Sequence, residues 1–457
     1  MNNTKANNID NCYYPLHIPE ARDIIERESR AALHRKYGDD PHAVVTERFN
    51  KELEKIDELC AEDYYVAYLI AKKCDELGFV HSLRGCGGSS FIAYLLGITE
   101  VNPLPPHYYC PECGHVECVD EYLFPFGTDL NNVKKECPAC GSKMRGDGQN
   151  SPWEFFLGFE GDKVPDFVFN VPSRNEIFDY LVERFGKDKV FNDGQIINGK
   201  VEVQPGRIIL VPEDVDVNDF AEVLLPGDKA REDETYHGQI VILDDRKRFP
   251  HIDVLENKVL KFLNMMQKRT GIPAKDINLR GGEIMDLLEY GDIWGFPFER
   301  DYAEKVKNVI DSTHPTSYTE LLKIYGNVHG TGVWENNNEI LCRGYTLHEM
   351  IAFREDVMLS LIRWGVEYKD AFALAESVRK GKVYRRHEYT DEEIETLINS
   401  RVPGWYVRSM EKIQYLFPKV HAVEYMNMYV RAIWYKKHYY DDYVQVMQDD
   451  LFADYML

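Results

Sequence analysis

The clearest chemical signal in the sequence is a set of four cysteines in two closely spaced pairs. They are Cys110 and Cys113 in the segment CPEC, and Cys137 and Cys140 in the segment CPAC, and a glycine follows each pair. Two residues between cysteines allow a tight turn that brings both thiolates to one ion, and two such turns complete a tetrahedral zinc site with no open position. The spacing therefore predicts a structural zinc site.

Three nearby side chains offer alternative ligands for such a site: Cys118, His107 and His115. The competing interpretation is that the cysteines are unrelated buried or redox-active groups, which requires two such pairs to occur together by accident. We therefore expect the four paired cysteines to be the ligands.

A second candidate is the glycine-rich segment SLRGCGGSSFIAYLLGI, residues 82–98, in which a turn with two serines leads into an apolar helix. The backbone N–H groups of the turn and the positive end of the helix could hold a phosphate. Arg84 would add charge-assisted contacts. Most glycine-rich turns before helices serve only as turns or allow close packing, so this segment alone does not establish a phosphate site.

A third candidate is the basic segment RKGKVYRRH, residues 379–387, which concentrates six basic or titratable side chains in nine residues. A solvated basic face is the simpler interpretation of such a run. In a chain whose formal net charge is −23, a dedicated phosphate contact is an equally good interpretation.

Composition limits the class of protein. The chain has 457 residues, 44% of them hydrophobic, and is long enough for two to four domains at roughly 150 residues each. Its acidic charge argues against bulk attraction to nucleic acid but allows a local basic groove. Ten cysteines are too few for a disulfide scaffold. With no N-terminal signal peptide and no apolar run of about 18 residues, we expect a cytoplasmic protein without a membrane span.

Four stretches of different pattern must position these groups. Residues 13–78 have a helical period, residues 79–171 hold the glycine-rich turns and cysteine pairs, and residues 172–270 mix helices with strand-like runs such as RIILVP and GQIVIL. Beyond Pro273 the pattern is almost wholly helical, with breaks at GNVHGTG, RKGK, RVPG and FPK. We therefore expect a mixed first half and a helical second half.

Several long segments resemble one family. The run SLRGCGGSSFIAYLLGITEVNPLPPHYYCPECGH, together with GDKVPD, resembles the bacterial DNA polymerase III alpha subunit of the PolC type, a C-family polymerase. The resemblance continues in YGDDPHAVVTERFNKELEKI upstream and in VQPGRIILVP, HGTGVW, ESVRKGK and VPGWYVRSMEKIQYLFPKVHAVEY downstream. These segments occur in the order of the family, so the chain resembles a truncated and diverged palm-plus-fingers portion of such a polymerase.

The resemblance implies an α+β fold. A polymerase palm, built on a nucleotidyltransferase-like mixed sheet with a four-cysteine zinc insertion, would be followed by a mostly helical fingers domain. Residues 13–78 would form the N-terminal helical part of the palm or thumb region, 79–270 the palm, 107–145 the zinc insertion, and 271–457 the fingers. The implied partners are primer–template DNA, deoxynucleoside triphosphates and other replication proteins.

The resemblance also implies a set of nucleotide contacts. In the family, an arginine-glycine-serine turn contacts the phosphates of the incoming nucleotide, and basic residues of the fingers contact the triphosphate. The matching residues here are Arg84, Gly85, Gly88, Ser89, Ser90, Arg379, Lys380, Lys382, Lys419 and His421. The turn departs from the family at two positions, since Cys86 and Gly87 replace a serine and a valine.

The catalytic site that the resemblance implies is incomplete. In the family two divalent ions are held by two aspartates one residue apart on a strand and by a third from a neighbouring strand. Here the first matches Asp166 and the third Asp253, but Val168 occupies the second position. Magnesium binds oxygen ligands, which valine lacks, so we expect polymerase activity to be weak or absent. A loss of about 3 kcal/mol of charge stabilisation would already slow the reaction roughly a hundredfold.

Other departures point the same way. Gln204 stands where the family has a histidine, Arg207 stands where it has a second glycine, and the stretch 191–203 is shorter than in the family. No segment matches the exonuclease, oligonucleotide-binding, helix-hairpin-helix or clamp-binding parts of the larger enzymes, so processive synthesis by this chain alone is not expected.

Three hypotheses about function follow. The preferred one is a polymerase homologue that binds DNA and nucleotide with impaired chemistry. The second is an active or partner-dependent polymerase, in which Glu160, Asp162 or another chain supplies the missing carboxylate. The third is a DNA- or nucleotide-binding interaction protein of a phage or mobile element, without chemistry. Magnesium would be a cofactor only if chemistry survives, whereas the zinc prediction holds in each case.

Overall fold

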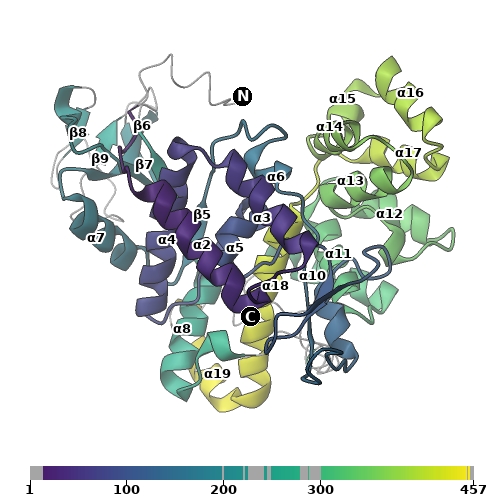
Figure 1. Cartoon of the computed structure of the whole chain (residues 1–457), viewed down its shortest axis with the longest axis horizontal. Coiled ribbons are helices and arrows are strands. Elements are labelled where there is room, and N and C mark those ends of the chain that lie inside the picture. The colour runs from purple at the N-terminus through teal and green to yellow at the C-terminus, as the bar shows by residue number, and fades with distance from the viewer. Residues whose placement is uncertain are drawn as a thin grey trace.

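The computed structural model describes residues 14–197, 200–219, 222–224, 241–243, 249–277, 287, 300–449 and 451–452. The first residues of the predicted strand GQIVIL and part of the predicted helical region, 278–286 and 288–299, lie outside the described residues. The described chain combines a mixed sheet with many helices, so the predicted α+β class is confirmed (Figure 1).

Three helices precede the first strand in the part of the chain that the structure describes: α2 (Ala21–Tyr37), α3 (Ala43–Lys55) and α4 (Glu58–Glu76). The helical period predicted for residues 13–78 continues across the gap between α3 and α4. The structure divides it because the Asp57 side chain accepts a hydrogen bond from the Cys60 N–H at 2.9 Å and so begins a new helix. Phe49 and Tyr64 of these helices are buried in the core that also covers the main sheet.

The main sheet has seven described strands, in the spatial order β1-β5-β10-β7-β6-β9-β8. In chain order they are β1 (Ser82–Arg84), β5 (Val168–Val171), β6 (Val190–Ile197), β7 (Lys200–Leu210), β8 (Glu222–Leu224), β9 (Val241–Leu243) and β10 (His251–Glu256). Strand β5 runs parallel to β10 and β6 runs parallel to β9, whereas the other neighbouring pairs are antiparallel. The predicted strand-like runs RIILVP and GQIVIL thus contribute to β7 and β9.

One face of this sheet packs against the hydrophobic core. Four further helices belong to this half of the chain: α5 (Phe91–Leu95), α6 (Glu154–Leu157), α7 (Arg174–Phe185) and α8 (Lys258–Thr270). Phe169, Val254 and Ile208 are fully buried in a core that also contains apolar residues of α2, α4 and α7. Because side chains alternate along a strand, Val168 and Asp253 point to the opposite face, where both are half-buried.

A second, antiparallel sheet holds the cysteine pairs. Its strands, in spatial order, are β3 (Val116–Cys118), β2 (His107–Tyr109) and β4 (Arg145–Asp147). A half-buried ion pair ties it to α2, since Lys36 Nζ lies 2.7 Å from Asp147 Oδ2. Burial alone would raise the pKa of Asp147, but the Lys36 charge holds it well below its usual range. The small sheet is therefore fixed against the N-terminal helices.

The second half of the chain is helical where it is described. Its helices are α10 (Arg300–Thr313), α11 (Tyr318–His329), α12 (Trp334–Leu341), α13 (Arg354–Arg363), α14 (Tyr368–Arg379), α15 (Lys382–Arg386), α16 (Asp391–Asn399), α17 (Gly404–Lys412), α18 (Lys419–His438) and α19 (Tyr440–Met447). All four breaks predicted from the sequence coincide with helix ends. In the described ranges, no helix has both the length and the apolar character needed to cross a bilayer.

Helix α18 connects the two halves. It has buried residues on every side and packs against β1, α8 and α11, as expected for a helix enclosed by protein. Figure 1 shows it in the middle of the molecule, between the sheet and the group α12 to α17. Its first residues therefore lie against β1 and the glycine-rich turn.

Candidate functional site

Four residues lie in one row across the main sheet. Arg84 of β1 is paired with Val168 of β5, Val168 with Asp253 of β10, and Asp253 with Arg207 of β7. Residues directly opposite each other on neighbouring strands share a face, so the four side chains form a line. Val168 thus stands between Arg84 and Asp253, at the position where the resemblance requires a carboxylate.

Arg207 engages both oxygens of the Asp253 carboxylate. Its Nε donates to Oδ1 at 3.0 Å and its Nη2 to Oδ2 at 3.2 Å. Through Nη1 the same guanidinium lies 4.0 Å from Oδ2 of Asp193, a carboxylate of β6. The hydrogen bond to Asp253 raises the pKa of Arg207 above its already high ordinary value, so this cation is permanent.

Asp166 belongs to the same site. It precedes β5 and lies within electrostatic reach of His251, Asp253 and Arg207. Loss of surrounding water raises the pKa of Asp166, and the charge of Asp253 adds to this increase, whereas the two basic neighbours oppose it. The structure therefore brings Asp166 and Asp253 together, but with basic groups among them.

These residues do not fit a pair of magnesium ions. Magnesium requires near-octahedral oxygen ligands, at least one or two of them carboxylates. The side chain of Val168 has no oxygen, and both carboxylate oxygens of Asp253 accept hydrogen bonds from Arg207. A divalent ion at Asp253 would also be repelled by the adjacent guanidinium. We therefore assign no metal-dependent step to this site.

The two serines of the glycine-rich turn face inward. Ser89 Oγ lies 2.9 Å from Ser151 Oγ, and Ser90 Oγ lies 2.8 Å from the hydroxyl of Tyr64. Both Ser89 and Ser90 are fully buried. Their hydroxyls therefore hold the turn against the core.

The helix end after this turn also has an internal partner. The buried Glu52 carboxylate accepts hydrogen bonds from the N–H groups of Phe91 at 2.8 Å and Ile92 at 3.1 Å. Ser90 Oγ accepts the next one, from Ala93, at 3.0 Å. The phosphate contact remains a prediction, and it would depend on the exposed Arg84 rather than on this short helix.

Close packing accounts for the glycines at the centre of the turn. A Cβ added to Gly87 would lie 2.7 Å from Leu83 Cδ1, and one added to Gly88 would lie 3.0 Å from Cβ of Val420 in α18. Larger residues would push the turn away from β1 and α18. Gly85 instead needs its φ of +73°, which other residues rarely adopt.

The basic segment meets the glycine-rich turn around one carboxylate, Glu376. Its Oε1 accepts a hydrogen bond from Arg379 Nε at 2.8 Å, and Lys380 Nζ lies 3.3 Å from its Oε2. Arg354 Nη1 reaches Oε1 at 3.3 Å, while Nη2 of Arg354 donates to Cys86 Sγ at 2.9 Å. Burial alone would raise the pKa of Glu376, but Arg379 and Arg354 hold it well below its usual range. A chain of contacts thus joins α13 and α14 to the turn.

Sequence reasoning missed Arg354, Glu376 and Lys163. Lys163 lies near this group, since its Nζ is 5.8 Å from the centroid of the Phe372 ring in α14. Burial lowers the pKa of Lys163, the charge of Glu376 opposes this decrease, and the charges of Arg354 and Lys380 add to it. We call Lys163, Arg354, Arg379 and Lys380 the basic cluster. The sequence marked two of these residues only by their nearness to predicted site residues: Glu376 lies three residues before Arg379, and Lys163 lies three residues before Asp166.

Lys419, a predicted nucleotide contact, is buried at the start of α18. Its Nζ donates to the carbonyl oxygens of Pro125 at 3.2 Å and Asn150 at 3.3 Å, and lies 4.2 Å from the centroid of the Phe126 ring. Burial lowers the pKa of Lys419 to about 8. The ammonium group therefore connects α18 to the segment that carries the small sheet.

His421 is buried in the first turn of α18. Its ring stacks on Phe417 with 4.6 Å between ring centroids. Burial and the positive charge of Arg84 lower the pKa of His421 to about 3. None of the described residues hydrogen-bonds its buried Nε2. The structure thus brings His421 close to Arg84, whereas Lys382 lies exposed at the start of α15.

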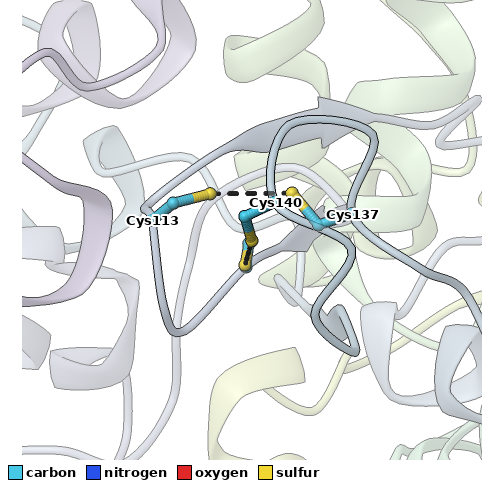
Figure 2. Close-up of side chains that lie close together, drawn as sticks. Cys113, Cys137 and Cys140 are labelled. Atoms are coloured by element: carbon cyan, nitrogen blue, oxygen red, sulfur yellow. Dashed lines mark hydrogen bonds between the residues drawn. The ribbon is translucent and has the colours of Figure 1, made fainter.

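The four paired cysteines converge, as Figure 2 shows for three of them. All four sulfur atoms lie within 4.8 Å of one another. Sγ of Cys110 is 3.5 Å from that of Cys140, and Sγ of Cys113 is 3.6 Å from that of Cys137. Metal–sulfur bonds of about 2.3 Å in a tetrahedron place the sulfurs about 3.8 Å apart, so the cluster could hold a metal ion.

The two cysteine turns share one backbone geometry. In each, the first cysteine donates its N–H to the carbonyl of the residue five positions later, and the following glycine donates to the carbonyl of the first cysteine, at 2.8 to 2.9 Å. Gly114 and Gly141 have φ of +74° and +76°. Both turns therefore present their thiols in the same way.

The alternative ligands considered from the sequence are not part of this group. The His107 ring is buried and lies 3.3 Å from the hydroxyl of Tyr37. His115 lies 3.5 Å from Glu117, and Cys118 is exposed on β3. Over the described part of the chain, the four paired cysteines are the one set of metal-binding side chains that comes together.

Comparisons with known proteins identify relatives of this chain. Residues 23–205 match the family described as the bacterial DNA polymerase III alpha NTPase domain. A protein of Caldanaerobacter subterraneus subsp. tengcongensis named DNA polymerase III PolC-type is 34% identical over 506 residues, covering 97% of this chain and 35% of that protein. Its namesake from Listeria monocytogenes is 34% identical over 500 residues, 96% of this chain and 34% of that one. The Thermotoga maritima protein is 33% identical over 485 residues, with 93% and 34% covered.

The matched residues 23–205 include strands β1, β5 and β6 of the mixed sheet. The fold and the matches together define the class: the chain is a homologue of the bacterial DNA polymerase III alpha subunit. Within that class it is a relative of the PolC-type DNA polymerase III. It spans about a third of the length of the curated relatives that it matches.

The depressed pKa of His421 predicts a pH dependence of stability. The folded protein holds this pKa at about 3, compared with 6.5 for an ordinary histidine. Between these values the unfolded chain binds a proton that the folded protein does not. The free energy of unfolding should therefore fall as the pH decreases from 6.5 toward 3, by up to about 1.4 kcal/mol per pH unit.

Urea unfolding of the wild type and His421→Gln at pH 7, 6 and 5 measures this contribution, which the substitution should remove. His438→Gln, at an exposed position of the same helix, is the matched control. An equal pH dependence in wild type and His421→Gln would contradict the assignment.

Proposed function

We propose that this chain is a PolC-type homologue that binds primer–template DNA and deoxynucleoside triphosphates but has little or no polymerase activity. The observation that carries the proposal is the position of Val168, between Arg84 and Asp253 in the row of side chains across the sheet. A carboxylate is absent where the family's two-ion chemistry needs one. The names of the curated relatives describe proteins about three times as long, so their activity is transferred here only as a hypothesis.

Nucleotide binding is supported by the basic cluster. Its four cations, Lys163, Arg354, Arg379 and Lys380, outnumber the carboxylates of Glu376 and Glu355 that pair with them. Arg379 and Lys380 retain contact with solvent. A triphosphate would add negative charge to a site with an excess of positive charge, so binding is electrostatically favourable.

The same geometry gives less support to the two alternative functions, an active or partner-dependent polymerase and an interaction protein. A carboxylate donated by Glu160, Asp162 or another chain would meet Asp253 with both oxygens already bound to Arg207. An interaction protein without nucleotide binding remains the second candidate, because Ser89 and Ser90 are bonded inside the protein. DNA and nucleotide binding distinguish that candidate from the preferred one.

We assign a structural zinc ion to the four paired cysteines. Four thiolates in a closed tetrahedral set are typical of structural zinc and leave no position for a substrate. When bound, zinc would join the two cysteine turns of the small sheet and so stabilise it. Cys110 and Cys137 are buried, whereas Cys113 and Cys140 are exposed.

Primer extension tests the main proposal. With Mg²⁺ or Mn²⁺ the wild type should extend a primer at least about a hundredfold more slowly than a PolC-type enzyme assayed alongside, because the missing ligand removes charge stabilisation in the transition state. Asp166→Ala should have no further effect. Fluorescence anisotropy should still detect binding of a labelled primer–template.

Two results would change this conclusion. Extension that disappears in Asp166→Ala would establish an active polymerase. An absence of both DNA and nucleotide binding would favour the interaction protein.

The basic cluster predicts which arginine contacts the nucleotide. Arg379→Ala should weaken binding of a fluorescent deoxynucleoside triphosphate about tenfold or more, because a charge-assisted hydrogen bond contributes roughly 1.5–3 kcal/mol. Arg385→Ala removes an equal charge from an exposed position in the same basic segment and should leave the dissociation constant nearly unchanged. Equal losses in the two variants would show that only the overall charge matters.

Metal analysis tests the zinc assignment. The purified protein should contain one zinc ion per chain, measured by mass spectrometry of the element. Cys140→Ser should lose the ion and melt at a lower temperature, because the closed site loses a ligand. Cys118→Ser changes another exposed cysteine of the same sheet and should keep both properties. Full zinc content in Cys140→Ser would refute the ligand set.

A further inference from the structure

Arg207 has a role that its sequence position does not reveal. Its guanidinium lies on the row of side chains that includes Val168 and Asp253, and it is the cross-strand neighbour of Asp253 on the side opposite Val168. It donates to both oxygens of Asp253 and lies 4.0 Å from Asp193. One fixed cation therefore pairs with the carboxylate of β10 and also lies near that of β6.

We infer that Arg207 is a built-in replacement for the divalent cation at Asp253, so that this carboxylate is paired without metal and the site excludes Mg²⁺ and Mn²⁺. This inference rests on the proposed function, since it explains how the catalytic position of a polymerase homologue is held without ions. It goes further by assigning the exclusion to Arg207 and not to Val168 alone.

The contacts explain the exclusion. A divalent ion shared by Asp166 and Asp253 must take at least one oxygen of Asp253, and both of these oxygens are bound by a planar, bidentate donor. The ion would also bring two positive charges next to one that no ordinary pH removes. Dissociating the pair first would leave a half-buried guanidinium without its carboxylate partner.

Val168 and Arg207 act together on Asp253. Valine at 168 removes one negative charge from the row, and arginine at 207 neutralises the charge that remains. An aspartate placed at 168 would itself stand between Arg84 and Asp253, with an arginine at each end of the row. Restoring a carboxylate at position 168 is therefore not enough to create a metal site, because Arg207 still binds Asp253.

Binding of Mn²⁺ to the zinc-loaded protein tests this, with the loss of the free-ion electron paramagnetic resonance signal as the measurement. The wild type, Val168→Asp, Arg207→Gln and the double variant Val168→Asp/Arg207→Gln are compared. We expect the double variant to bind Mn²⁺ at least about tenfold more tightly than Val168→Asp, because only the double variant frees both carboxylates for an ion. Any Mn²⁺ binding by the wild type should be unchanged in Asp253→Asn.

A remote pair provides the control for charge. Arg269 is paired with Asp442 on the surface, so Val168→Asp/Arg269→Gln has the same net charge as the double variant and also frees an aspartate. It should bind Mn²⁺ no more tightly than Val168→Asp. Melting temperatures of all variants verify that each is folded.

Two results would overturn the inference. One is a double variant that binds Mn²⁺ no more tightly than Val168→Asp. The other is Mn²⁺ binding by the wild type that becomes weaker in Asp253→Asn. This second comparison tests the inference even if the double variant does not fold.

Failure of the inference is distinguishable from failure of the proposed function. Mn²⁺ binding by a wild type that does not extend primers would refute the role of Arg207 and leave the proposed function intact. Primer extension by the wild type would refute the proposed function directly.

Discussion

The register of three neighbouring strands controls the chemistry available to this protein. Because β5 runs parallel to β10 and β10 antiparallel to β7, positions 168, 253 and 207 become lateral neighbours on one face. A shift of one residue would turn them to the other face and expose the core residues of the same strands. Phe169 and Val254 are fully buried and hold this register, so the composition of the site is tied to the packing behind it.

The scaffold around this row is joined to the helical half by buried polar contacts. Glu52 caps the helix after the glycine-rich turn, and Lys419 ties the start of α18 to the segment that connects β3 and β4 of the small sheet. Arg354, bonded to Cys86 and Glu376, connects the turn to the basic segment. Groups of this kind are costly to bury unless they are paired, so these contacts help specify how the two halves fit together. The glycine-rich turn and the basic segment are thus held in place relative to each other.

Much of the fold could be predicted because its signals are local. The helix ends in the second half follow from glycine and proline segments, and the strand-like runs of β7 and β9 follow from their apolar residues. The cysteine turns follow from the spacing of the two pairs, which brings all four sulfurs together. The break between α3 and α4 was missed, because the hydrophobic period continues through it and only the cap at Asp57 marks the division.

The sequence by itself determined that position 168 lacks an oxygen, that four cysteines have metal-binding spacing, and that one basic segment stands out in an acidic chain. Only the tertiary structure decided that Arg207 binds Asp253, that Ser89 and Ser90 face the core, and that Lys163 lies near the basic segment. These pairings join residues far apart in the chain through strand register and helix packing. Local sequence patterns do not encode such distances, because they depend on how the whole chain is folded.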